Sequence, residues 1–208
     1  MDDSSLRFVS NMTTSQHKHY NALLNSRVEE SADPAYAHSK VRYAHTREID
    51  SMHPDRHGNV RVTRDQKTGA LKRDGGCVRK TRLADMNVYC PKRCFDWRLS
   101  VSTEEPVDVP STPASHQRSK DRITYTHQLF RVDLTQVQAQ PVNRAPGAPP
   151  GEAKTTHELE VEFKDSRILL KEAERESRGD ESARYLEMVQ AFLNNIRLLI
   201  RNAPDPDD

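Results

Sequence analysis

The sequence predicts an α+β fold in which helices flank an antiparallel β-barrel. Three observations support this prediction: several segments of alternating β-forming residues, short turns between them, and a long amphipathic segment near the C-terminus. Strands joined by short turns pair in antiparallel fashion, and a helix with one apolar face packs against the resulting sheet.

The strands are expected where β-forming residues alternate with polar ones. The segments are residues 41–50, 59–64, 77–83, 95–104, 120–137 and 156–163. Turns that contain glycine are expected at residues 57–59, 67–69 and 74–76. Residues 105–117 and 139–153 are rich in proline and small residues and are expected to be loops, since proline cannot donate a ladder hydrogen bond.

Helices are expected at residues 14–25 and 181–201, where apolar residues recur at three- and four-residue spacing. Ser15 is the expected cap of the first helix, and His17 and His19 are interpreted as surface histidines rather than metal ligands. The domain is expected to span residues 14–202. Residues 1–13 and the tail at 203–208 are expected to be disordered.

Composition limits the class of protein without identifying it. The 208 residues suffice for one domain with a core, and the net charge of +1 hides a basic middle and an acidic C-terminal part. The three cysteines do not form a disulfide framework or a zinc-binding pattern, and they fit a reducing compartment. No apolar run approaches the roughly 20 residues of a membrane span, so no membrane association is expected.

Charged side chains lie on one face of several predicted strands. Since successive side chains of a strand point to opposite faces, residues two apart share a face. The shared faces are acidic at Glu158, Glu160 and Glu162, basic at Arg118, Lys120 and Arg122 and at Lys80 and Arg82, and mixed from Asp96 to Glu104. Ile123 and Tyr125 lie on the opposite face, where the two helices can cover them.

These faces suggest a site for a metal ion and an anion. Three glutamates about 7 Å apart repel one another unless a cation lies between them, and Mg²⁺ or Mn²⁺ favours carboxylate oxygens. A row of three cationic side chains is suited to a triphosphate. Each strand alone also fits a sheet with one solvated face. One-sided charge of both signs on four strands together favours a barrel with a charged interior.

The chain resembles the fungal-type mRNA 5′-triphosphatases, the beta subunits of the mRNA-capping enzyme, which are triphosphate tunnel metalloenzymes. The resemblance is carried by DWRLSVSTEEP at 96–106, RSKDRITYTHQLFRVDLTQV at 118–137 and HELEVEF at 157–163. It covers roughly residues 8–202 and implies a β-barrel tunnel that hydrolyses the γ-phosphate of 5′-triphosphate RNA. It also implies a nuclear location, a guanylyltransferase partner and a homodimer.

The resemblance assigns roles to individual residues. It implies that Glu160 and Glu162 bind Mg²⁺ or Mn²⁺, that Glu158 supports the basic side chains, and that Glu104 orients or deprotonates the attacking water. The implied phosphate-binding residues are Arg61, Lys80, Lys120 and Arg122, with Arg82 and Arg118 as further candidates.

One part of the family pattern is missing. The family's first acidic strand, an E-x-E motif, is expected before the helix at 14–25, and residues 1–13 contain no such strand. The barrel is therefore expected to lack its first strand and to have two unpaired edges. Either the chain is truncated or it is a degenerate member of the family.

Other functions are compatible with the same residues. The main alternative is a non-catalytic tunnel protein that binds RNA ends or the capping guanylyltransferase. A tunnel enzyme that acts on free nucleoside triphosphate or inorganic triphosphate is a third option. A generic RNA-binding module is the weakest, because aromatic residues make up only 6% of the chain and form no stacking pattern.

Overall fold

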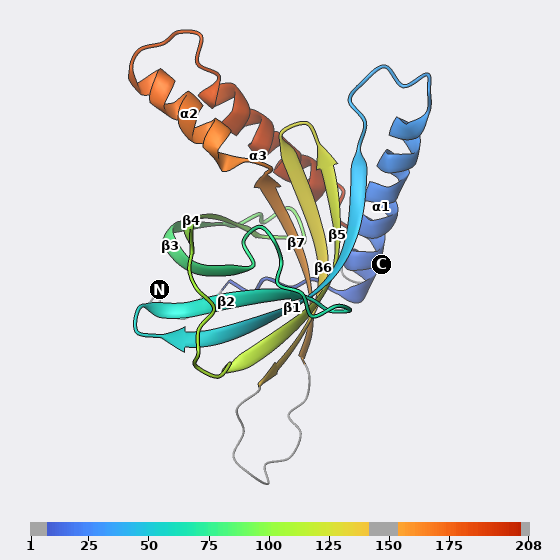
Figure 1. Ribbon diagram of the computed structural model, residues 1–208. Coiled ribbons are helices and arrows are strands. Elements are labelled where there is room, and N and C mark those ends of the chain that lie inside the picture. Colours follow the sequence, from blue (N-terminus) through green and yellow to red (C-terminus); the bar gives the residue numbers. More distant parts are fainter. Residues whose placement is uncertain (1–7, 142–153, 205–208) are drawn as a thin grey trace.

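The computed structural model describes residues 8–141 and 154–204, which form one curved antiparallel sheet and three helices (Figure 1). The sheet has seven strands in the order β4-β3-β2-β1-β5-β6-β7. The strands are β1 (Arg42–Asp55), β2 (Gly58–Asp65), β3 (Cys77–Val88), β4 (Trp97–Pro106), β5 (His116–His127), β6 (Phe130–Pro141) and β7 (Lys154–Phe163). The α+β prediction is confirmed.

The prediction of a single strand over residues 120–137 is wrong. This segment contains parts of two strands, β5 and β6, which pair from His127↔Phe130 to His116↔Pro141. The chain reverses at Gln128, which has a φ of 49°. A left-handed residue other than glycine is uncommon, so the turn carries none of the usual sequence signals.

The predicted loops are shorter than expected, because strands extend into them. The loop expected at 105–117 lies between the end of β4 at Pro106 and the start of β5 at His116. At the loop expected at 139–153, β6 continues to Pro141 and β7 begins at Lys154. Residues 142–153 lie outside the described residues. β3 and β4 pair from Val78↔Pro106 to Val88↔Trp97, with a register shift between Arg82 and Ala84.

The helices also differ from the prediction at their ends. Helix α1 spans Thr14–Ala32, and its cap is Thr13 rather than Ser15: Thr13 Oγ1 accepts from the Gln16 N–H, and the Gln16 side chain accepts from the Thr13 N–H. Helix α3 spans Tyr185–Arg201. Helix α2, at Ser166–Ser177, was not predicted, although Asp165 caps it directly after β7 by accepting a hydrogen bond from the Arg167 N–H.

The hydrophobic core lies on the outer face of the sheet, beneath α1 and α3. Buried Tyr20 of α1 packs in a cluster with Tyr125 of β5 and Leu134 of β6, and Ile123 contacts this cluster as the strand alternation predicts. The Tyr20 hydroxyl donates to the Leu199 carbonyl of α3 at 2.8 Å. The opposite, inner face carries the charged rows of β5 and β7, together with the buried side chains of Val78 and Val137.

The sheet is open rather than a closed barrel in the described residues, with β4 and β7 at its edges. Residues 8–13 contact the β7 edge: the Met12 N–H donates to the His157 carbonyl at 2.9 Å, and the His157 N–H donates to Asn11 Oδ1. Ala203 packs against the core. Residues 1–7 and 205–208 lie outside the described residues. No helix in the described part of the chain is long and apolar enough to cross a membrane.

Candidate active site

The register of the sheet places the sequence-predicted site residues of β2 to β7, Arg82 included, on one face by direct pairing or alternation. Paired residues on neighbouring strands point to the same face. Lys80 pairs with Glu104, and Lys120 with Glu48. Arg118 pairs with Asp50, which in turn pairs with Thr63, two residues from Arg61. On the other side of β5, Arg122 pairs with Thr135, which pairs with Glu158. Since the core occupies the opposite face, this is the inner, concave face.

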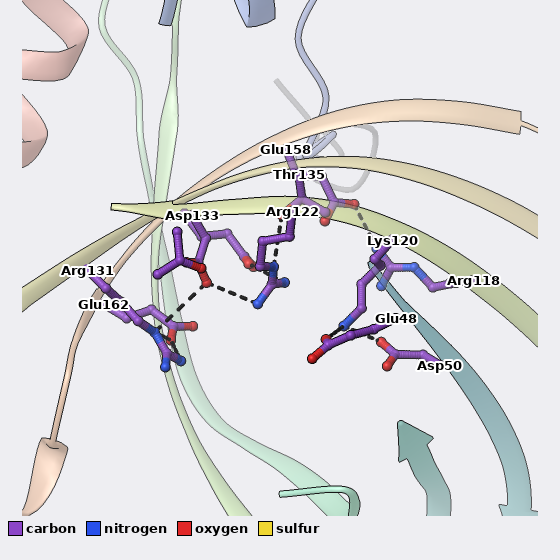
Figure 2. Close-up of polar contacts among 12 residues, drawn as sticks. Glu48, Asp50, Arg118, Lys120, Arg122, Arg131, Asp133, Thr135, Glu158 and Glu162 are labelled. Carbon is purple, nitrogen blue, oxygen red and sulfur yellow. Dashed lines mark hydrogen bonds and ion pairs between the residues drawn. The ribbon is translucent and has the colours of Figure 1, made fainter. Parts of the chain in front are cut away.

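The basic row of β5 meets a separate acidic partner at each position (Figure 2). Arg118 Nη2 lies 2.9 Å from Glu158 Oε1, and Lys120 Nζ lies 2.7 Å from Asp50 Oδ2. Arg122 Nη1 lies 3.0 Å from Asp133 Oδ2. The three cations point into the concave space and are held at fixed positions along it, as a chain of phosphates requires.

The Lys120 ammonium is buried, and its position is set by a hydrogen-bond chain. The Thr63 hydroxyl donates to Asp50 Oδ1 at 2.7 Å, which leaves Oδ2 for Lys120. Burial alone would raise the pKa of Asp50, but Lys120 and the Thr63 hydrogen bond hold that pKa below its ordinary value. Asp50 is therefore a carboxylate at neutral pH, and it pairs with the Lys120 side chain in a site with little contact to water.

Arg122 is held by two groups of β6. Besides Asp133, its Nε donates to the Thr135 hydroxyl at 3.0 Å, and Asp133 also accepts a hydrogen bond from the Thr124 hydroxyl at 2.7 Å. Asp133 and Thr135 are fully buried. Because Nε and Nη1 both have acceptors on β6, the guanidinium plane is fixed, with Nη2 3.5 Å from Glu160 Oε2.

The acidic row of β7 consists of Glu158, Glu160 and Glu162. Glu158 is occupied by Arg118, and Glu162 forms an ion pair with Arg131 of β6. Among the described residues, Glu160 forms an ion pair only with Arg122, at the long distance of 3.5 Å, and keeps 43% of its side chain exposed. Burial among protein atoms is the main cause of its raised pKa, with the Arg122 charge lowering it and the neighbouring carboxylates Glu162, Glu158 and Asp133 raising it.

This environment fits a divalent cation at Glu160. Its raised pKa means that the protein destabilises the carboxylate, and a bound cation would reverse that effect. The available donors are carboxylate oxygens, the type that Mg²⁺ and Mn²⁺ prefer. Within residues 8–141 and 154–204, no three acidic, histidine or cysteine side chains already converge on one metal position. A cation held here would complete its shell with water or phosphate oxygens, as Mg²⁺ commonly does.

The second part of the site lies on β2, β3 and β4. Arg61 Nη2 lies 3.2 Å from Glu104 Oε1, and Lys80 Nζ lies 3.8 Å from the same oxygen. Arg82, by contrast, pairs with Asp85 three residues further along its own strand, at 3.0 Å. The structure therefore brings Arg61 and Lys80 to Glu104 and gives Arg82 a local partner beside the register shift.

Sequence reasoning missed five residues of the concave face. They are Glu48 and Asp50 on β1 and Arg131, Asp133 and Thr135 on β6. The β6 residues were missed because an unbroken strand over 120–137 would place its odd-numbered residues on the other face of the sheet from Arg122. The two-residue turn at Gln128 inverts this parity. The β1 pair has a visible signal, two carboxylates at i and i+2 in a predicted strand.

Comparisons with known proteins identify the family of the chain. Residues 1–205 match the family model described as mRNA capping enzyme, beta chain. The mRNA-capping enzyme subunit beta of Cryptococcus neoformans is 37% identical over 199 residues, and that of Schizosaccharomyces pombe is 35% identical over 201 residues. Each alignment covers 94% of this chain, and the chain spans 46% and 62%, respectively, of the length of these relatives.

Solved structures give the same result for the fold. The S. pombe Pct1 RNA triphosphatase superimposes with a TM-score of 0.83 at 34% identity, over 98% of this chain and 75% of that chain. The structure of Pct1 in complex with the Spt5 CTD gives a TM-score of 0.81 over 95% of this chain and 73% of that chain. The fold described above is thus shared with an RNA triphosphatase, and the chain belongs to the mRNA-capping enzyme beta-chain family.

Proposed function

We propose that this chain is a metal-dependent polynucleotide 5′-phosphatase that removes the γ-phosphate from 5′-triphosphate ends of nascent mRNA, the first step of capping. The observation that carries the proposal is the β5 row, in which Lys120 and Arg122 face the same concave space as Glu160. Phosphoryl transfer depends mainly on positioning and charge neutralisation, and this row supplies both.

Each group of site residues has a role that follows from its chemistry. Lys120 and Arg122, with Arg118, Arg61 and Lys80, bind the phosphates and offset the charge that develops on them. Glu104 accepts hydrogen bonds and orients the attacking water in line with the leaving diphosphate. Glu160 and Glu162 hold the Mg²⁺ or Mn²⁺ ion, which polarises the γ-phosphate when bound. Arg82 contributes less, because Asp85 already holds its guanidinium.

The substrate must displace some of the ion pairs described above. Arg122 has its Nη2 at 3.5 Å from Glu160, the longest of its contacts, so this side of the guanidinium is the one that phosphate oxygens can take. Glu160 would also hold the metal ion, so its contact with Nη2 is the one that Arg122 can give up to phosphate. Asp133 and Thr135 keep the rest of the side chain in place during this exchange.

The test is phosphate release from triphosphate-ended RNA with Mg²⁺ or Mn²⁺. Glu160→Ala and Arg122→Ala are each expected to abolish release while the fold survives. Arg47→Ala is the matched control, since Arg47 is an exposed cation on the outer face of β1 that pairs with Asp121. Activity of either site variant at the wild-type level would refute the assignment. Competition with free nucleoside triphosphate and inorganic triphosphate would separate an RNA-specific enzyme from one acting on small substrates.

Binding without hydrolysis is the second candidate function. It is favoured by the lack of three converging metal-ligand side chains in the described part of the chain. In that case triphosphate-ended RNA, or the guanylyltransferase, would bind and no phosphate would be released at any metal concentration.

We further propose a nuclear location, a guanylyltransferase partner and a homodimer. The family membership supports these assignments, and the related Pct1 was solved with the Spt5 CTD bound. Co-purification with the capping guanylyltransferase and light scattering of the purified chain would test the partner and the dimer separately.

A further inference from the structure

The connection between β2 and β3, residues 66–76, brings one more cation to the concave face. Lys72 Nζ lies 2.7 Å from Glu48 Oε1. Glu48 is buried, and its second oxygen, Oε2, has no hydrogen-bond partner among the described residues. The nearest cation to Oε2 is Lys120, whose Nζ lies 3.6 Å away while remaining 2.7 Å from Asp50. Lys72 and Lys120 thus share one buried carboxylate.

The backbone fixes Lys72 at this place. Its N–H donates to the Thr63 carbonyl at 3.0 Å, and the Thr63 N–H donates to the Gly76 carbonyl at 2.6 Å. Gly76 is required here, since a Cβ at this residue would lie 2.0 Å from the Lys72 carbonyl oxygen. The Thr63 hydroxyl in turn binds Asp50, so the connection is anchored to the same strand position that orients Lys120.

The charges explain what Lys72 does. Two carboxylates, Glu48 and Asp50, lie beside two ammonium groups, Lys72 and Lys120. Burial raises the pKa of Glu48, and this is outweighed by the hydrogen bond and charge of Lys72 together with Lys120 and Arg122. Without Lys72, Lys120 would be the main cation that neutralises Glu48. One ammonium group would then neutralise two buried carboxylates, Glu48 and Asp50. An incoming phosphate would then compete with both.

We propose that Lys72 is a positioning residue for polyphosphate binding, because by neutralising Glu48 it leaves the Lys120 charge available to the phosphate. This inference rests on the proposed function, in which Lys120 binds the triphosphate. It gives the β2–β3 connection a role in substrate affinity although Lys72 need not touch the substrate.

The test is calorimetric binding of inorganic triphosphate to the full chain in Mg²⁺ buffer, which needs no turnover. Lys72→Met is expected to weaken binding about tenfold, a size typical of coupling between charged neighbours. Lys72→Arg, which keeps the charge, should bind within about twofold of wild type. Lys67→Met is the matched control from the same connection, since Lys67 forms no ion pair within the described residues, and it should also stay within about twofold.

The decisive variant is the double substitution E48Q/K72M. Once Glu48 is neutral, loss of Lys72 should matter little, so the double variant should bind within about twofold of E48Q alone. If K72M matches wild type, or if its defect persists in the E48Q background, Lys72 acts by another route and the inference is overturned. If the wild-type chain does not bind triphosphate, the phosphate site of the proposed function fails, and this inference fails with it. Urea unfolding of each variant confirms that the folded protein is being measured.

Discussion

Two parts of the concave face differ in how firmly their charged residues are held. In the β5–β7 wall, Lys120 and Asp133 have side chains only 8% and 2% exposed, and helices α1 and α3 cover the outer face. In the β3–β4 hairpin, the side chains of Lys80 and Glu104 are 50% and 40% exposed. Leu83, Met86, Tyr89 and Val101 of this hairpin are more than half exposed. One part is preorganised by burial, whereas the other depends on solvent-exposed contacts.

The comparison shows that substituting the same kind of charged residue changes the free energy of unfolding by different amounts in the two parts. A buried ion pair is stabilised by its partner and becomes strongly unfavourable when one partner is removed. An exposed pair contributes little to stability because water and salt screen it. Substitutions in the β5–β7 wall should therefore affect stability and activity together, and those in the β3–β4 hairpin mainly activity.

The largest expected effect is a loss of stability when Asp133 is substituted. Its carboxylate accepts from Arg122 and from the Thr124 hydroxyl, so Asp133→Ala leaves a partly buried guanidinium without its main partner. We expect a loss of about 3–5 kcal/mol in the free energy of unfolding, measured by urea denaturation. Asp85→Ala, which breaks the exposed pair with Arg82, should cost at most about 1 kcal/mol. Equal losses for the two variants would contradict the comparison.

The next effect separates activity from stability in the β3–β4 hairpin. Glu104→Gln removes the carboxylate that orients water, and kcat for phosphate release should fall by about 100-fold. Because Glu104 is exposed, its free energy of unfolding should change by no more than about 0.5 kcal/mol. A large loss of stability in this variant would show that the hairpin is held by Glu104 as firmly as the wall is by Asp133.

The smallest expected effect is a pH dependence of stability on the outer face of the β5–β7 wall. The rings of His17 and His157 lie 4.6 Å apart, and burial lowers the pKa of both; the His157 charge lowers that of His17 further, while Asp121 raises it. The unfolded chain therefore takes up protons first. Stability should be level above pH 6.5 and should decline as the pH falls through 6.5 towards the lowered folded-state pKa values.

His17→Gln tests this dependence. Urea denaturation at pH 7.5 and 5.5 should show a smaller loss on acidification for the variant than for wild type, because it lacks the ring whose pKa is lowered by burial and by His157. An unchanged loss would mean that other groups cause the acid sensitivity. His19→Gln is a suitable control, since His19 is exposed on the same helix and its Nε2 contacts the Asn202 carbonyl oxygen.

The sequence predicted the parts of this molecule that follow from local alternation. The charged rows at 118–122 and 158–162 and the apolar row with Ile123 and Tyr125 required only the period of two. The β5–β6 turn at Gln128 could not be predicted, because its conformation is imposed by strand pairing rather than by a turn-forming residue. That error concealed Asp133 and Thr135. His17 was interpreted as a surface residue, whereas it is partly buried against His157, a contact between residues far apart in sequence.

The most direct test of the central claim is a crystal structure of the chain with inorganic triphosphate and Mn²⁺. We expect the triphosphate on the concave face against Lys120 and Arg122, with the anomalous signal of Mn²⁺ at the Glu160 carboxylate. Triphosphate bound on the outer face, or Mn²⁺ at acidic residues away from β7 with the concave face empty, would contradict the claim.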